Sequence, residues 1–368
     1  MRTAFLTRRT FIAGASCFGA AAALAHTIPL PAMAGAIAQD KRIAEAPLLD
    51  KGFAVTRRIG QGVYGTISDF SKGPQTISNG GFIVGKDAAL LIEGHTQPAG
   101  AAFELEALRM VSQVPVRGAV ITHYHFDHSL GNSFFGTQGI PIWAHAKVGP
   151  LMVEHYAGVQ GRDKSALLGP FEKAVGEATD PLRRQRAEGD LGAARTMFGA
   201  VDTSILSLPN RPVDAGQFPM TIDLGGVRAV LETCPGHTPA DVVIRLPEQN
   251  ITFTGDLLFH AWYPVTFDAD MSGWRKTLKA FAGFGKDALF VPGHGQVCGQ
   301  EGIALLRSVM DDLASQAEKF YKAGVPVAEA QQRYVVPERF KDFPIFAWSF
   351  CIGTAIAKFY AEWQPQKR

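Results

Sequence analysis

The sequence predicts an α/β protein whose candidate functional residues lie at the ends of its strands. Between residues 53 and 300, short runs of β-branched and aromatic residues bounded by glycine alternate with stretches of helical spacing. Histidine and aspartate residues follow several of these apolar runs directly. The chain has 368 residues, of which 46% are hydrophobic and 19% charged, which is ordinary for a globular protein with a large core.

The first 38 residues are predicted to be an export signal. Residues 7–12, Thr-Arg-Arg-Thr-Phe-Ile, match the twin-arginine pattern, and an apolar stretch follows from Phe11 to Leu24. Ala32-Met33-Ala34 is a small-x-small cleavage site, with a second candidate at residues 36–38. A Sec-type signal or a retained anchor is the alternative. We therefore expect the twin-arginine export machinery as a partner and a periplasmic or secreted bacterial protein.

Charge and hydropathy limit the classes of partner that we expect the mature chain to bind. Removing residues 1–34 leaves 33 basic against 34 acidic residues, so the mature chain is close to neutral. The densest basic group is Arg183, Arg184 and Arg186, which acidic residues follow, as on a solvated helix face. This predicts no nucleic-acid partner, and no later run is long enough to span a bilayer. A small-molecule substrate is the expected ligand.

Residues 39–52 are predicted to be a flexible lead-in, and the strand–helix alternation starts after them. A hairpin turn is expected at Gly85-Lys86-Asp87. The expected strands of this first half are residues 53–59, 63–68, 81–84, 88–92, 116–121 and 140–144, with a helix over residues 98–111.

Residues 147–207 interrupt the alternation with helical patterns only, and about sixty residues is too long for a connection without structure. We predict a helical insertion or lid there, with helices over residues 148–156, 171–178, 180–187 and 191–198. Strands resume at residues 220–224, 227–232, 242–246, 251–254 and 289–291, with a helix over residues 274–284. Residues 301–368 are predicted to be a helical C-terminal extension of the catalytic domain at residues 53–300.

Metal-ligand residues cluster after the strand that ends at Ile121. His123, His125, Asp127 and His128 lie within six residues, and imidazole and carboxylate are ligands that Zn²⁺ takes. His237, Asp256 and His294 likewise follow apolar strands. Because strand ends along one sheet edge can converge, the seven side chains provide enough ligands for two metal ions with an open position each.

These residues resemble the metallo-β-lactamase superfamily. The resemblance rests on four motifs and on the hairpin of residues 79–92, and it covers roughly residues 53–300. The four motifs are His123-x-His125-x-Asp127-His128, Pro235-Gly236-His237-Thr238, Thr254-Gly255-Asp256 and Pro292-Gly293-His294-Gly295. The resemblance implies a four-layer αββα sandwich with the site at one edge.

The resemblance also implies the roles of the ligands. His123, His125 and His237 would hold the first ion, and Asp127, His128 and His294 the second. Asp256 would bridge both. Two Zn²⁺ ions are implied, with Fe or Mn as alternatives. They would share a water, lower its pKa and so give hydroxide near neutral pH, while Asp127 acts as the catalytic residue that orients this nucleophile.

Departures from the family pattern bear on the substrate. Glu93 stands where an aspartate is usual and is expected to support a ligand. Asp256 at the bridging position resembles glyoxalase II-like hydrolases, and residues 254–259 resemble exported hydrolases of sulfur-oxidation and quinoprotein gene clusters. The main hypothesis is that the protein hydrolyses an ester, thioester, lactone or amide. The alternatives are a β-lactamase-like lactam hydrolase and a mononuclear iron dioxygenase or non-catalytic metal-binding module on the same fold.

The remaining histidines and cysteines have structural interpretations. His260, four residues past Asp256, is a candidate for facing the substrate, and a partly buried strand-end role is the alternative. His95 and His155 are expected at the surface. Cys234 and Cys298 are expected to be buried structural thiols rather than a disulfide.

Overall fold

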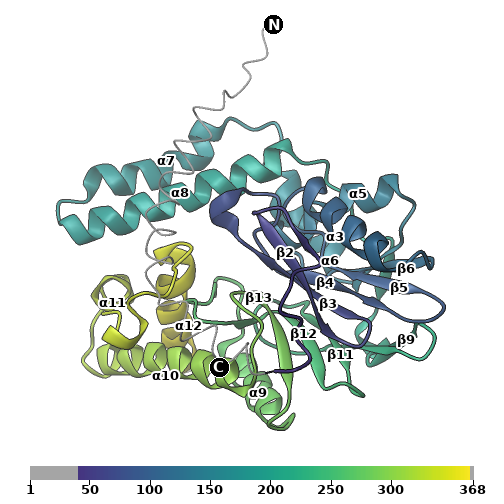
Figure 1. Cartoon of the computed structure of the whole chain (residues 1–368). Coiled ribbons are helices and arrows are strands. Elements are labelled where there is room, and N and C mark those ends of the chain that lie inside the picture. Colours follow the sequence, from purple (N-terminus) through teal and green to yellow (C-terminus); the bar gives the residue numbers. More distant parts are fainter. Residues whose placement is uncertain (1–39, 365–368) are drawn as a thin grey trace, which may run out of the picture.

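A computed structural model describes residues 40–364 (Figure 1). The predicted export signal at residues 1–38 lies outside the described residues. Part of the predicted lead-in is held by contacts: Arg42 donates to the carbonyls of Gln249 and Asp287, and strand β1 (Leu49–Asp50) pairs with β2. No helix among the described residues is long and apolar enough to cross a membrane.

The chain forms two mixed sheets whose strands follow one another in sequence order. In the larger sheet, β1 to β5 pair antiparallel and β5 to β8 pair parallel. In the smaller sheet, only β12 and β13 pair parallel. The larger sheet contains β1, β2 (Ala54–Gly60), β3 (Val63–Ser68), β4 (Gly80–Val84), β5 (Ala89–Ile92), β6 (Val116–Val120), β7 (Ile142–His145) and β8 (Arg211–Val213). The smaller sheet contains β9 (Met220–Asp223), β10 (Arg228–Thr233), β11 (Val242–Leu246), β12 (Ile251–Phe259) and β13 (Leu289–His294).

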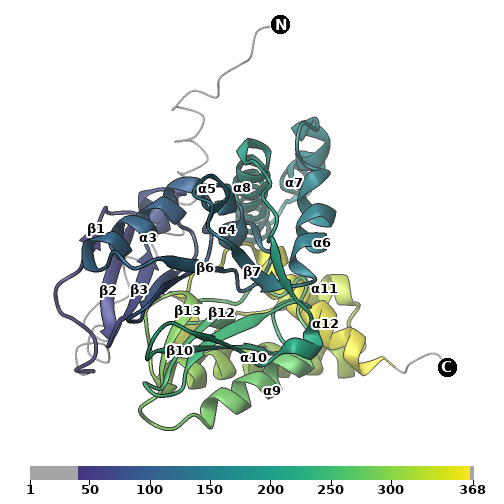
Figure 2. The ribbon, with the colours of Figure 1, turned by 90° about the vertical axis from the view of Figure 1, so that its right-hand side faces the viewer.

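Helices cover the outer face of each sheet, which confirms the predicted αββα sandwich. Figure 2 shows α3 (Pro98–Val111) and α5 (Asn132–Thr137) over the larger sheet, and α9 (Met271–Ala282) and α10 (Gln300–Lys322) under the smaller one. Three separate apolar clusters fill the spaces between the four layers. The two sheets therefore face each other across an apolar layer, and each has a second apolar layer beneath its helices.

The side chains of the hairpin formed by β4 and β5 pack into two apolar layers, one on each face of the sheet. Phe82 and Leu91 belong to the apolar cluster under α3, whereas Ile83 and Leu90 belong to the cluster between the sheets. Successive side chains of a strand point to opposite faces, so a strand buried on both faces needs an unbroken apolar run. The apolar runs of β4 and β5 are therefore those of central strands, buried on both faces.

Residues 147–207 form helices, with boundaries that differ from those predicted. The chain forms α6 (Val148–Met152), a π-helical turn (Val153–Ala157), α7 (Lys164–Glu177) and α8 (Pro181–Thr203). The two short helices predicted over residues 180–187 and 191–198 are one helix, because Gly189 costs only about 1 kcal/mol relative to alanine in a helix interior. Asp180 caps this helix by accepting a hydrogen bond from the Arg183 amide. Figure 1 shows α7 and α8 lying side by side away from the sheets.

The last helices pack on the smaller sheet and lie beside the ends of the strands. After α10 come α11 (Val327–Arg333), a π-helical turn (Ser349–Gly353) and α12 (Thr354–Trp363). They share one apolar cluster with α9 and β12. This region begins with α10 packed directly on the sheet, so it adds to the core of the sandwich.

Candidate metal centre

The loop after β6 supplies four of the seven predicted ligands. His123 and His125 lie in the loop, and Asp127 and His128 lie in the one-turn helix α4 (Phe126–Ser129). All four side chains are buried. The Ser129 hydroxyl bonds the carbonyls of the preceding turn, which fixes the path of the loop. The close spacing of the motif thus places imidazole and carboxylate groups on both sides of one short turn.

The other sheet supplies the remaining three. His237 follows β10 in a turn where Thr238 donates to the buried Asp241 carboxylate from both its amide and its hydroxyl. Asp256 lies within β12, which continues to Phe259 instead of ending at residue 254 as predicted. The strand bulges at Gly255, whose φ of 51° favours glycine, and this bulge turns Asp256 toward the site.

A second glycine makes room for the Asp256 carboxylate. Gly293 lies beside it on the neighbouring parallel strand β13, one residue before His294. A Cβ atom at Gly293 would lie 1.9 Å from Asp256 Oδ1, which no side chain can accommodate. The glycine of this Pro-Gly-His sequence is therefore required for the carboxylate to reach its position.

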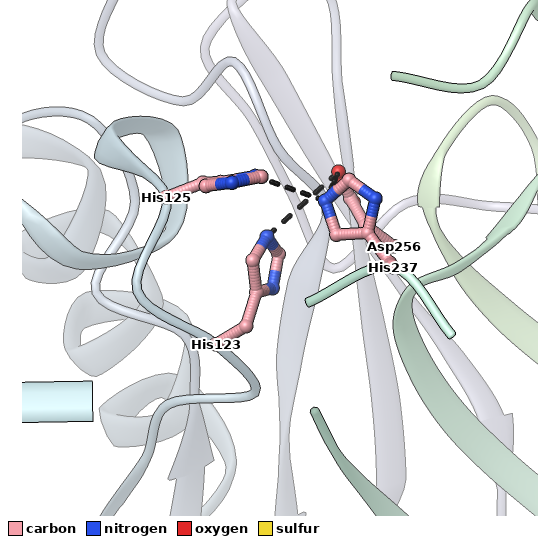
Figure 3. Close-up of side chains that lie close together, drawn as sticks. All are labelled: His123, His125, His237 and Asp256. Carbon is pink, nitrogen blue, oxygen red and sulfur yellow. Dashed lines mark hydrogen bonds and ion pairs between the residues drawn. The ribbon is translucent and has the colours of Figure 1, made fainter. Parts of the chain in front are cut away.

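The first ligand group contains His123, His125, His237 and Asp256, whose ligand atoms all lie within 4.8 Å of one another. Figure 3 shows the two histidines of the β6 loop pointing across toward His237 and Asp256. His237 Nε2 lies 2.9 Å from His125 Nδ1 and 3.3 Å from Asp256 Oδ2. His123 Nε2 lies 3.9 Å from the same Asp256 oxygen.

The second group contains Asp127, His128 and His294, again within 4.8 Å of one another. His294 Nε2 lies 3.2 Å from Asp127 Oδ2 and 3.4 Å from Asp256 Oδ1. His128 Nε2 lies 3.1 Å from Asp256 Oδ1 and 3.5 Å from Asp127 Oδ2. Asp256 therefore presents Oδ2 to the first group and Oδ1 to the second, which is the geometry of a bridging carboxylate.

The protons of two facing histidines are held on their far sides. His237 Nδ1 donates to the Val265 carbonyl at 3.0 Å, and His125 Nε2 lies 3.2 Å from the Asp268 carboxylate. Both partners are acceptors, so in the neutral imidazoles the lone pairs lie on His237 Nε2 and His125 Nδ1. These two nitrogens face each other at 2.9 Å. A metal ion between them would satisfy both lone pairs, so the residues fit a metal ion.

Glu93 and Thr122 lie behind the next two histidines. Glu93 Oε1 lies 3.1 Å from His128 Nδ1, on the side away from the second ligand group. The Thr122 hydroxyl donates to Glu93 and lies 3.0 Å from His123 Nδ1, whose N–H it can accept. Partners of this kind orient metal-binding imidazoles and fix their tautomers. Consistently, the buried His123 Nε2 and Asp256 Oδ1 atoms make no hydrogen bond, which leaves them for a metal.

Burial and charge set opposite protonation states in the two groups. Burial lowers the pKa of His123 and lowers that of His237 to about 3. Burial also acts on His128 and His294, but the carboxylates override it: Asp256 and Asp127 raise the pKa of His128 and raise that of His294 to about 9. The pKa of Asp256 is held well below its usual range, since His294 and His128 outweigh its burial.

A cavity opens on both ligand groups. Asp127, Asp256, His294 and also His125 form its polar end. Its other walls are apolar and largely aromatic, and they come from chain segments far apart in the sequence. These walls consist of Phe70, Ile77, Phe126, Tyr156, Met197, Phe259, Trp262, Tyr263, Val265, Phe267, Phe346 and Phe350.

Two of the other histidines are buried, and for His260 this agrees with the alternative strand-end role. His260 is buried with Nδ1 2.9 Å from the Gln296 carbonyl, and it is not among the residues that line the cavity. The expected surface role of His95 is wrong: its side chain is fully buried, and its Nε2 lies 2.9 Å from Glu104 Oε1. Burial raises the pKa of Glu104 to about 7. His155 is exposed, as predicted.

The structure also brings residues to the site that the motifs did not indicate. The Asp268 carboxylate accepts the Tyr124 hydroxyl and contacts His125, so it joins the loop after β12 to the loop after β6. Nothing in the local sequence around Asp268 distinguishes it from a surface loop residue. Its pKa is nevertheless lowered, because His125 and Tyr124 outweigh its burial. Cys234 and Cys298 are free thiols; Cys298 is buried as expected, whereas Cys234 is only partly buried.

The sandwich fold and its convergent histidines and aspartates define a metal-dependent enzyme. The chain belongs to the metallo-beta-lactamase superfamily, because the family model of that description matches residues 73–294. Among solved structures it is similar to a metallo-beta-lactamase from Pontibacter korlensis, with a TM-score of 0.51, 20% identity and coverage of 70% of this chain and 98% of that one. It is also similar to a double mutant of the sec-alkyl sulfatase PisA1, with a TM-score of 0.58 and 16% identity. This match covers 84% of this chain and 50% of the sulfatase chain. The protein is a metal-dependent hydrolase.

Proposed function

We propose that the protein is an exported hydrolase with two zinc ions that cleaves an ester, thioester, lactone or amide. The observation that carries the proposal is the position of Asp256 between two complete ligand groups. Its two oxygens face different histidines, at 3.3 Å from His237 and 3.1 Å from His128. Histidine and carboxylate ligands suit zinc, while Fe and Mn are the alternatives.

The chain's own residues account for the remaining requirements of hydrolysis. When bound, two divalent ions lower the pKa of a shared water and polarise a carbonyl. Asp127 is buried beside His294 and lines the cavity, so its carboxylate can orient the attacking water and accept its proton. The aromatic walls exclude bulk water from this step. No serine or cysteine nucleophile is required.

Metal content and a substrate panel test this proposal. The mature protein, loaded with zinc, is assayed for bound metal by mass spectrometry and against ester, thioester, lactone, β-lactam and phosphodiester substrates. We expect two zinc ions per chain, hydrolysis of at least one carboxyl substrate and loss of activity on chelation. A preference for the β-lactam favours the alternative lactamase function. One iron per chain with oxygen consumption would refute the hydrolase.

Export is part of the proposal and rests on the N-terminal sequence alone. Arg8 and Arg9 lie in the twin-arginine pattern. Changing both to lysine should block transport of the folded protein, which immunoblots of periplasmic and cytoplasmic fractions measure. Undiminished periplasmic protein would show a Sec-type signal instead.

A further inference from the structure

Aromatic side chains of the cavity wall lie directly beside the predicted metal ligands. The Trp262 ring lies 5.5 Å from the His294 ring, and the Phe267 ring lies 4.8 Å from the His125 ring. Phe70 packs edge-on against Trp262 at 5.1 Å. A substrate whose reacting carbonyl is held between the two ligand groups must therefore place its adjoining group against these rings.

The far wall comes from segments outside the two sheets. Met197 belongs to α8, and Phe346 and Phe350 precede α12. Phe350 contacts Phe267 at 5.5 Å, so this far wall is continuous with the rings next to the ligands. The predicted insertion and the C-terminal helices thus meet over the site and shape the part of the cavity that is remote from the metals.

The charged groups of the cavity are confined to its polar end. Among the described residues that line it, the carboxylates of Asp127 and Asp256 are the only anionic groups, and none is lysine or arginine. Arg186 lies in the same helix as Met197, but its guanidinium stacks on Trp348 at 3.3 Å and donates to the carbonyls of Gln332 and Tyr334. A carboxylate or phosphate on the remote part of a substrate would lose its hydration here without gaining a partner, which is costly.

We propose that the substrate carries an uncharged, apolar group next to the scissile bond, aromatic or alkyl, which the aromatic cavity holds while the carbonyl faces the metals. This inference rests on the proposed hydrolase function for its direction of binding. It assigns recognition of the substrate to apolar burial rather than to ion pairing. It also sets the chemical class that the ester, thioester, lactone or amide must belong to.

A set of three phenyl esters tests the charge requirement with the zinc-loaded protein. Phenyl hexanoate is compared with one analogue carrying a carboxylate at the acyl end and another carrying it at the para position of the ring. We expect kcat/KM for at least one charged analogue to be about tenfold or more below that of the neutral ester, since an unpaired buried charge costs well over 1.4 kcal/mol. Differences below about threefold for both analogues would overturn the proposal.

A cation introduced into the cavity wall should reverse the preference. In Met197→Lys, the disfavoured analogue should gain about tenfold relative to the neutral ester, because the ammonium supplies the missing partner. Met197 is only partly buried, so lysine can be accommodated there. Met110→Lys is the matched control, because Met110 is 56% exposed on α3. An equal change in both variants would count against the assigned wall.

A binding measurement separates this inference from the proposed function. The corresponding ketones, in which a methylene replaces the ester oxygen, cannot be hydrolysed and are titrated by calorimetry. If no ester is hydrolysed but the neutral ketone binds at least about tenfold tighter than a charged one, the hydrolase proposal fails and the apolar cavity stands. If neutral and charged ketones bind alike, the inference fails whatever the activity.

Discussion

The two ligand groups of the metal centre share Asp256 but differ in charge. In the first group, burial keeps the imidazoles of His123 and His237 neutral by lowering their pKa values. In the second group, the pKa of His128 is raised and that of His294 is raised to about 9, because two carboxylates face them. The same residue type is thus tuned in opposite directions within a few ångströms.

This difference indicates how the site would take up metal. Neutral imidazoles can bind a cation without releasing a proton, whereas protonated ones must first lose theirs. In the metal-free protein the second group places histidines with raised pKa values beside the carboxylates of Asp127 and Asp256. We therefore expect the first group to bind metal more tightly near neutral pH, and the second to bind in competition with protons.

The largest effect is expected from removing the carboxylate that the groups share. Asp256→Ala takes a ligand from both and should lower kcat/KM by at least about 100-fold, since loss of a mere supporting partner already costs about 10- to 100-fold. Zinc content should fall below two per chain by mass spectrometry. Asp311→Ala removes an exposed carboxylate on α10 and is the control. Retained activity with full metal content would disprove the bridging role.

The pH dependence of zinc binding tests the charge difference directly. Below a pKa of about 9 for His294, a proton must leave before metal binds, so affinity for the second ion should rise about tenfold per pH unit for each proton displaced. Affinity for the first ion should stay nearly constant, because the pKa of His237 is about 3. Chelator competition between about pH 6 and about pH 8 measures both constants. Parallel slopes for the two ions would show that the groups do not differ.

Two matched substitutions distinguish the groups through their supporting carboxylates. Glu93→Gln acts behind His128 and should weaken the second ion by about 10- to 100-fold, and Asp268→Asn acts behind His125 and should weaken the first by a similar factor. Both changes keep shape and remove charge. Stepwise zinc titration with a chromophoric chelator resolves the two constants. Equal weakening of both ions by each variant would show that the site responds as one unit.

These supporting residues also show how far the sequence could be interpreted. The seven ligands lie in compact motifs at or near strand ends, so local pattern was sufficient to predict their convergence. Glu93 was also accessible, because it stands at a motif position. Asp268 was not, since it meets His125 only after two loops from different sheets have packed together.

The sequence predicted neither the aromatic cavity nor the burial of His95, and the reason is the same for both. Rings from residues 70, 262, 267, 346 and 350 meet only in three dimensions, and each alone has the pattern of ordinary aromatic packing. His95 lies in a polar loop typical of a surface, but its φ of 58° turns the side chain inward to Glu104 on α3. A fold can bury such a pair at a position where composition predicts exposure.

Thr122 is the one residue that supports both groups, and its substitution should have the smallest effect. Its hydroxyl donates to Glu93 and accepts from His123 Nδ1, so it couples the proton positions behind His128 and behind His123. Thr122→Val preserves the shape and removes both bonds, each worth about 1 kcal/mol. Zinc titration should show both ions weakened by about three- to tenfold, with kcat/KM following. Weakening of the second ion alone would mean that another acceptor holds the His123 proton, and that the two groups are tuned independently.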